Sequence, residues 1–207
     1  MNLKVKPITK LFYHYYDYKI IMDADHYDEV TQGLDFFNSE HGQMVSKTKT
    51  VYSKGKVNLY FNGDESLDYY QKHYKDMIQS VSGPINDYHR SILLKKDIEI
   101  KKTLYYKKYR YKIKFLRRNR NSNLSGDIIA KLKDMVRTNP TDYLGMNLYE
   151  QMSGRYHYFG LTPMVYVSDR QSLMMLELAG KEYISQRIKV ITIKEIENNE
   201  RYDEETN

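Results

Sequence analysis

The stretch 11-LFYHYYDYKIIM-22 has a close counterpart later in the same chain, 104-LYYKKYRYKIKF-115. The two align without a gap, and six of the twelve positions are identical. A second pair follows in the same order, LYFNGDESLDYY at 59–70 and VYVSDRQSLMML at 165–176, with about 13 extra residues inserted in the later copy. Self-similarity in a fixed order is the signature of a repeated structural unit. The sequence therefore predicts two tandem copies of one module.

The hydrophobic pattern of the first copy predicts a strand, a helix, a hairpin and a second helix. Alternating apolar residues predict a strand over 11–22, and helical spacing predicts helices over 25–41 and 65–81. Between the two helices, the Lys54-Gly55 pair predicts a turn with a strand on either side.

The second copy repeats this order and ends in a clear strand. We expect the corresponding last strand of the first copy either within 84–94 or at 97–102. The elements predicted for the second copy are a strand over 105–116, helices over 127–136, 141–152 and 169–184, hairpin strands over 155–159 and 164–168, and a final strand over 187–196.

The order strand–helix–strand–strand–helix–strand resembles the ferredoxin-like or RRM-like module. We therefore expect an α+β protein made of two tandem ferredoxin-like βαββαβ modules with antiparallel sheets. The first module is predicted over 1–98, the second over 99–197, and an acidic tail over 198–207. In such a sheet the helices cover one face and leave the other face open.

The composition limits the classes of protein to which the chain can belong. It contains no cysteine, which excludes disulfides, zinc–thiolate sites and cysteine nucleophiles. No apolar run reaches the roughly 20 residues of a transmembrane helix, and the first residues lack the apolar core of a signal peptide. We therefore expect a cytoplasmic protein with no membrane partner. Abundant Lys, Asn, Tyr, Ile and Met are typical of an AT-rich genome, such as that of many phages or low-GC bacteria.

Positive charge is concentrated in one part of the chain. Residues 95–120 hold twelve Lys and Arg against Asp97 and Glu99, so the rest of the chain is net negative although the whole carries +6. On the predicted strand, alternation places the aromatic and apolar residues of 109–115 under the helices and the cations on the open face. Cations spaced at about 7 Å suit the phosphates of a nucleic-acid backbone.

We interpret the chain as a nucleic-acid-binding protein that contacts RNA or single-stranded DNA through this basic strand and the loop after it. Two tyrosines of the hairpin strand 155–159 are predicted to stack on bases. The predicted residues are Lys108, Arg110, Lys112, Lys114, Arg117, Arg118 and Arg120 for phosphates, and Tyr156 and Tyr158 for stacking. The alternatives are a structural or assembly protein that docks on acidic partner subunits, and a row of lysines that only solvates its strand.

A pair of aspartates follows the first predicted strand. The stretch 19-KIIMDADHYDEV-30 resembles the start of polymerase and nucleotidyl-cyclase palm domains, in which carboxylates after a strand hold Mg²⁺ for phosphoryl transfer. The resemblance implies a metal site at Asp23 and Asp25. The further carboxylate expected on the adjacent hairpin is absent from KTVYSKGKVNLYF, and Asp25 also fits a helix cap. We therefore expect no metal and no other cofactor.

The tandem architecture with an early histidine also resembles the CRISPR repeat-processing endoribonucleases, which cleave RNA by general-base catalysis without a metal. The resemblance implies that role for His26, at the start of the first helix. The glycine-rich loop of that family is missing near the C-terminus, where TPMVYVSDRQSLMMLELAGKEY holds a single glycine. We therefore favour a protein that is not an enzyme, and keep this ribonuclease as the third interpretation.

Overall fold

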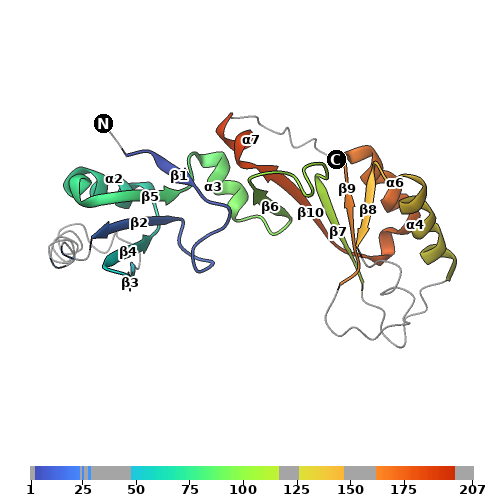
Figure 1. Cartoon of the computed structure of the whole chain (residues 1–207), viewed down its shortest axis with the longest axis horizontal. Helices are drawn as coiled ribbons and strands as arrows, with labels where there is room; N and C mark the ends of the chain where they lie inside the picture. Colours follow the sequence, from blue (N-terminus) through green and yellow to red (C-terminus); the bar gives the residue numbers. More distant parts are fainter. Residues whose placement is uncertain are drawn as a thin grey trace. The chain divides into compact units, whose positions relative to one another are not determined.

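The computed structural model describes residues 3–23, 25, 28, 48–116, 126–146 and 162–198. Within these ranges the chain is a mixed α+β protein with two five-stranded sheets and helices between strands (Figure 1). It divides into two compact units, Met1–Leu94 and Lys95–Asn207. The predicted α+β class is confirmed, and the organisation is compatible with two tandem modules.

The first unit forms a sheet with the strand order β1-β5-β2-β4-β3. Strand β2 pairs antiparallel with β4 and β5, β3 pairs antiparallel with β4, and β1 runs parallel to β5. The elements are β1 (Val5–Pro7), β2 (Tyr18–Asp23), β3 (Lys49–Ser53), β4 (Lys56–Phe61), α2 (Asp64–His73), the 3₁₀ turn η2 (Lys75–Met77), β5 (Ile78–Gly83) and α3 (Asp87–Leu93).

The second unit has the equivalent order β6-β10-β7-β9-β8, with β6 parallel to β10 and the other pairs antiparallel. The prediction of purely antiparallel sheets is therefore wrong, because each unit adds one parallel edge strand. The elements are β6 (Ile98–Lys101), β7 (Tyr111–Phe115), α4 (Gly126–Thr138), β8 (Tyr143–Met146), β9 (Met164–Val167), α6 (Arg170–Gly180), the 3₁₀ turn η3 (Lys181–Tyr183), β10 (Ile184–Thr192) and α7 (Ile193–Glu197).

The two units correspond residue by residue. The β2–β4 pair Tyr18↔Phe61 recurs in β7–β9 as Tyr111↔Val167, so equivalent residues differ by 93 before the inserted segment and by 106 after it. The later offset also relates the first residues of α2 and α6, and those of β5 and β10. The irregularity in the β2–β5 ladder recurs at the same place in β7–β10. The units thus share one topology and, for these antiparallel strands, one register.

The long first strand predicted for each copy is wrong in its N-terminal half. Residues 12–16 and 105–109, called the tyrosine turns below, each reverse the chain before β2 or β7 begins. The first amide of each turn donates to the last carbonyl, at 2.8 Å and 3.1 Å. Two consecutive residues in each turn have φ of about 50–60°, the left-handed region of a type I′ turn. They are Tyr13, His14, Tyr106 and Lys107.

Each sheet has apolar contacts on both faces. On one face, helix residues such as Tyr70 of α2 and Leu176 of α6 complete a core with alternate residues of the central strands. On the other face, Tyr60 of β4 and Tyr166 of β9 lie under the tyrosine turns. The predicted open face is therefore partly covered by residues that the alternation pattern places in the strand.

Other predicted elements also differ in the structure, including the final strand 187–196, whose last four residues lie in α7. The helix predicted over 65–81 ends at His73, and its last residues form β5. Ile78 and Val81 are three apart, which fits a helix face, but a ladder irregularity lets both point into the core of the sheet. The segment 97–102 contains β6 of the second unit, and β8 lies within the predicted helix 141–152. The predicted helix 25–41, apart from two residues, and strand 155–159 lie outside the described residues.

A short helix follows the last strand of each unit. In α3 the cap residue Asn86 accepts from the His89 amide at 2.7 Å, and in α7 Thr192 forms a capping box with Glu195. The His89 ring is completely buried, with Nε2 2.8 Å from the Ile8 carbonyl and Nδ1 accepting from Ile85 N at 3.3 Å. This geometry requires a neutral ring that donates from Nε2, and burial lowers the pKa of His89.

Acid should destabilise the first unit through His89. Because burial lowers the pKa of His89 in the folded state, the unfolded chain binds the proton more readily. The stability from the neutral ring is present above the unfolded pKa of about 6.5 and is lost as the pH falls below it, towards the lowered folded value. Urea unfolding between pH 7.5 and 5 should show this loss. The dependence of the free energy of unfolding on pH should become weaker in His89→Gln. It should persist in the control His73→Gln, because the side chain of His73 is exposed.

Substitution of Gly83 should destabilise the same unit for a steric reason. A Cβ at Gly83 would lie 2.2 Å from Cδ1 of Tyr18, and that ring is held by hydrogen bonds to Asp64 and Arg90. We expect Gly83→Ala to lower the free energy of unfolding by about 1–3 kcal/mol, the usual cost of overpacking. Gly55→Asn is the control, because Gly55 has open space around it and Asn tolerates its φ of +72°. Equal denaturation midpoints for Gly83→Ala and the unmodified protein would contradict this packing.

Candidate functional site

The predicted basic row begins in a turn rather than in a strand. Lys112 and Lys114 belong to β7 and alternate with Ile113 and Phe115, which point into the helix-side core. The two lysines therefore occupy the opposite face, as expected. Lys108 lies in the tyrosine turn, exposed, with its Nζ 5.5 Å from the centroid of the Tyr109 ring.

Three of the predicted cations have partners within their own unit. Arg110 Nη2 lies 2.7 Å from Glu195 Oε1 in α7, with the two side chains only 19% and 13% exposed. Lys112 Nζ lies 2.8 Å from Glu99 Oε2, and Lys114 Nζ donates to Gln186 Oε1 at 2.9 Å. Phosphate contact by these residues stays a prediction, and it would require an exchange of partners.

The Arg110–Glu195 pair fastens the terminal helix α7 to the start of β7. The first unit has a pair at the matching place, between Asp17, just before β2, and Arg90 of α3, with Arg90 Nε 3.4 Å from Asp17 Oδ2. The residue before the strand is acidic in the first unit, Asp17, and basic in the second, Arg110. The partner on the helix has the opposite charge in each case. We call these two ion pairs the helix latches.

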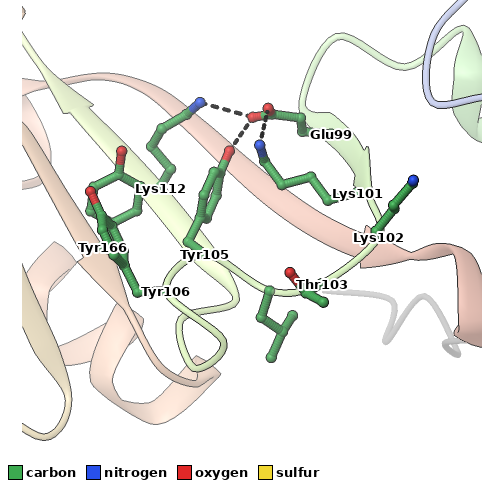
Figure 2. A pocket seen from close by; sticks show the side chains of 9 residues that line it. Glu99, Lys101, Lys102, Thr103, Tyr105, Tyr106, Lys112 and Tyr166 are labelled. Carbon is green, nitrogen blue, oxygen red and sulfur yellow. Dashed lines mark hydrogen bonds and ion pairs between the residues drawn. The ribbon is translucent and has the colours of Figure 1, made fainter.

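A pocket of about 490 Å³ lies beside the second tyrosine turn. Its wall combines lysines, tyrosines and a single carboxylate from β6, the turn, β7 and β9 (Figure 2). The lining residues are Glu99, Lys101, Lys102, Thr103, Leu104, Tyr105, Tyr106, Lys112 and Tyr166. Three cations against one anion leave the pocket with net positive charge.

Glu99 is the centre of the hydrogen bonding in this pocket. Lys112 and the Tyr105 hydroxyl donate to its Oε2, and Lys101 Nζ lies 3.1 Å from Oε1. Figure 2 shows the three contacts converging on the carboxylate, whereas Lys102 points away from it. Burial alone would raise the pKa of Glu99, but the three donors outweigh burial and hold that pKa at about 2. The carboxylate is therefore ionised at every physiological pH.

The tyrosines of the pocket form a packed frame with one exposed member. The Tyr166 ring centroid lies 4.8 Å from that of Tyr105 and 5.2 Å from that of Tyr106. Lys101 and Lys112 lie 4.8 and 5.0 Å from the Tyr105 ring centroid. Tyr106 is 57% exposed, at the tip of the turn. The site thus offers an exposed aromatic ring next to ammonium groups.

The first unit has the same frame with different chemistry. The ring of Tyr60 contacts Phe12 and Tyr13 at centroid distances of 5.5 and 5.0 Å, as Tyr166 contacts Tyr105 and Tyr106. The ungapped alignment, however, pairs Glu99, Lys101 and Tyr105 with Lys6, Ile8 and Phe12. The edge-strand ladders are shifted by two residues relative to this alignment, so that Ile8 takes the position of Glu99. The carboxylate and the phenol oxygen are therefore specific to the second unit.

The other predicted site residues divide into two groups. Asp23 ends β2, where it accepts from Gln79 Nε2, and Asp25 is exposed. Among the residues that the structure describes, no group of three acidic or histidine side chains is placed to hold a metal. Arg117, Arg118, Arg120, Tyr156, Tyr158 and His26 lie outside the described residues.

The sequence pattern assigns no role to Glu99, Lys101, Lys102, Tyr105 and Tyr106. The first three fall in a segment that fits the last strand of the first copy, and the tyrosines fit the core of a strand. The ungapped alignment of 11–22 with 104–115 carries a usable signal, since extending it upstream pairs Lys6 with Glu99 and Ile8 with Lys101. Such changes of charge between copies mark positions that the shared fold does not require.

No protein-family model matches the chain, and no curated protein matches it either. In the described ranges, no helix has both the length and the apolar character needed to cross a membrane.

The helix latch of the second unit should contribute measurably to stability. We expect Arg110→Ala to lower the free energy of unfolding by about 1–3 kcal/mol, because Glu195 would keep a mostly buried charge without its partner. The charge-reversed single variants Arg110→Glu and Glu195→Arg should each lose stability, and the double variant that combines them should regain part of it. Urea unfolding of the two single variants and the double variant measures this.

An exposed ion pair provides the control for this cycle. Arg137 and Asp134 lie 3.9 Å apart on α4 with both side chains mostly exposed, so Arg137→Ala should change stability by less than about 0.5 kcal/mol. Equal losses from Arg110→Ala and Arg137→Ala would show that burial of the latch has no energetic effect.

Proposed function

We propose that the chain is a cytoplasmic protein that binds RNA or single-stranded DNA through the pocket of its second unit. The observation that carries the proposal is the combination of three lysines, an exposed tyrosine and a single carboxylate in one pocket. Basic grooves with aromatic side chains are the common solution for binding single strands, since the cations follow the backbone and the rings stack on bases.

The charges around the pocket support contact with phosphates. Lys102 is exposed at its rim, and Lys107 and Lys108 are exposed in the adjoining tyrosine turn. Lys101 and Lys112 add two further cations inside the pocket, from β6 and β7. Binding that depends on such contacts weakens as the salt concentration rises. The reason is that the protein displaces cations condensed on the phosphates, and their release is less favourable at higher salt.

The exposed ring favours single strands over duplexes. Tyr106 is braced edge-on against Tyr166, with an interplanar angle of 79°, while more than half of its surface remains accessible. A base can stack on such a ring only if it is unpaired or splayed out of its helix. Tyr106 thus replaces Tyr156 and Tyr158 as the first stacking residue to test.

We also propose that each unit is a ferredoxin-like module with one added strand. In the second unit, β7-α4-β8-β9-α6-β10 has the order of the βαββαβ module, and its four strands pair antiparallel. The added strand, β6, brings Glu99 and Lys101 to the pocket. RRM-type members of this fold bind RNA on the sheet face away from the helices, which is the face of Lys112 and Tyr166.

Direct binding measurements test the proposed function. Fluorescence anisotropy with a short labelled RNA, the matching DNA strand and the duplex, at two salt concentrations, should show binding of the single strands that weakens with salt. Tyr106→Ala should weaken it by about 1–3 kcal/mol, the usual contribution of base stacking. Lys102→Glu with Lys107→Glu should make the salt dependence shallower by about 0.7 for each phosphate that the protein no longer neutralises.

The first unit supplies the matched control for this titration. Tyr13 sits at the same place in its turn as Tyr106 and is equally exposed, so Tyr13→Ala should bind as the unmodified protein does. If the protein is instead an assembly factor that docks on acidic partner subunits, polyglutamate should bind as well as RNA and Tyr106→Ala should have no effect. RNA cleavage that is abolished by His26→Ala would favour the ribonuclease interpretation.

A further inference from the structure

The position of Glu99 within this basic pocket calls for an explanation. A carboxylate that binds two lysines and a phenol cancels part of the charge on which the proposed binding depends. The fold does not require a carboxylate there, because the first unit has Lys6 at the aligned sequence position and Ile8 at the position given by the edge-strand register. A charged side chain that the fold does not need, at the centre of a basic pocket, is a candidate for a role in ligand binding.

We propose that Glu99 is a resident anion that occupies a phosphate site formed by Lys101, Lys112 and Tyr105. A phosphate group of the bound strand would take over these donors, and Glu99 would swing out of the site. This inference rests on the proposed function, and it assigns to Glu99 the control of affinity. Its removal should therefore strengthen binding, whereas removal of any other residue of the pocket should weaken it.

The geometry of the donors fits a phosphate. Two ammonium groups and one hydroxyl converge on the two oxygens of Glu99, one from each of β6, β7 and the tyrosine turn. Phosphate oxygens accept charge-assisted hydrogen bonds from the same donor types. Because the donors already point at one anion, a second anion could bind there without rearranging the sheet.

The location of Glu99 also permits the exchange. Strand β6 is the edge strand of its sheet, and among the strands that the structure describes it pairs with β10 alone. Glu99 and Lys101 are each about one third exposed, so both side chains can reach solvent. The carboxylate can therefore leave the lysines for water, which is not true of Glu195, the mostly buried latch residue.

Competition, rather than protonation, must open this site. The three donors keep Glu99 ionised under all physiological conditions, so a change of pH near neutrality leaves the carboxylate in place. An incoming phosphate succeeds only if the rest of the strand adds contacts elsewhere, as Tyr106 and Lys102 can. A free anion with no such contacts should be held weakly by the unmodified protein, and the site would select for polyanions.

Glu99→Gln tests the inference, with Glu177→Gln as its control. Glu177 is a half-buried carboxylate of the same unit, on α6, that is paired with Arg187, so its removal gives the same change in net charge. In anisotropy titrations with the labelled RNA, Glu99→Gln should bind about tenfold more tightly than the unmodified protein and with a steeper salt dependence. Glu177→Gln should bind as the unmodified protein does.

A second probe separates this inference from the proposed function. Inorganic pyrophosphate can be titrated against each protein while the backbone amides of β6 and β7 are followed by NMR. Where RNA binds, tighter RNA binding by Glu99→Gln and not by Glu177→Gln supports the resident anion. If RNA binds but the affinities of Glu99→Gln and the unmodified protein are equal, the inference is overturned and the proposed function stands.

The remaining outcomes are also decisive. If no variant binds nucleic acid, the proposed function fails, and the pyrophosphate titration alone decides whether Glu99 occupies an anion site. Equal pyrophosphate affinities for Glu99→Gln and the unmodified protein would then overturn the inference as well. If Glu99→Gln is unfolded in a thermal melt, Glu99→Asp replaces it. Its shorter side chain draws the carboxylate back from the lysines, so it should bind more tightly than the unmodified protein, and equal affinity overturns the inference.

Discussion

Both units depend on one contact, the packing of a tyrosine turn over a tyrosine of the sheet. The turn holds two consecutive residues in the left-handed region, at a cost of about 1–2 kcal/mol each for residues other than glycine. Ring packing on Tyr60 and Tyr166 offsets this cost, because a buried aromatic side chain removes about 150–250 Å² from water. Tyr105 is buried over Tyr166, and Phe12 is half-buried over Tyr60. The turn reverses the chain, so the edge strand before it can run parallel to the last strand.

This turn also marks the limit of what the sequence could predict. Alternation and the Lys54-Gly55 turn signal correctly placed β2, β3, β4, β7 and β9, whose side chains alternate between a helix-covered core and the opposite face. It also extended β2 and β7 backwards through the turns, since YHYY and YYKK contain none of the Asn-Gly or Asp-Gly pairs that normally signal a type I′ turn. Ring packing on a distant strand fixes this turn, and local sequence does not report such contacts.

The same limit applies to the pocket. The basic segment could be predicted, because the density of charged residues can be counted directly along the sequence. The ion pairs of Arg110 and Lys112 could not, since their partners lie 85 and 13 residues away. Nor could the place of Glu99 among the lysines, because that depends on the parallel edge strand. The two copies serve as an internal comparison: where they agree the residues build the sheet, and where they differ, as at Glu99 and Tyr105, they build the pocket.

The reversed charges of the helix latches bear on how a duplicated chain reaches its native state. Two units with one topology can exchange equivalent elements during folding, a recognised failure of repeat proteins. If α7 docked on the first sheet, Glu195 would meet Asp17. If α3 docked on the second sheet, Arg90 would come near Arg110. Each exchange would set like charges together in a poorly solvated place. The opposite charge order of the two helix latches therefore favours docking of each terminal helix on its own sheet.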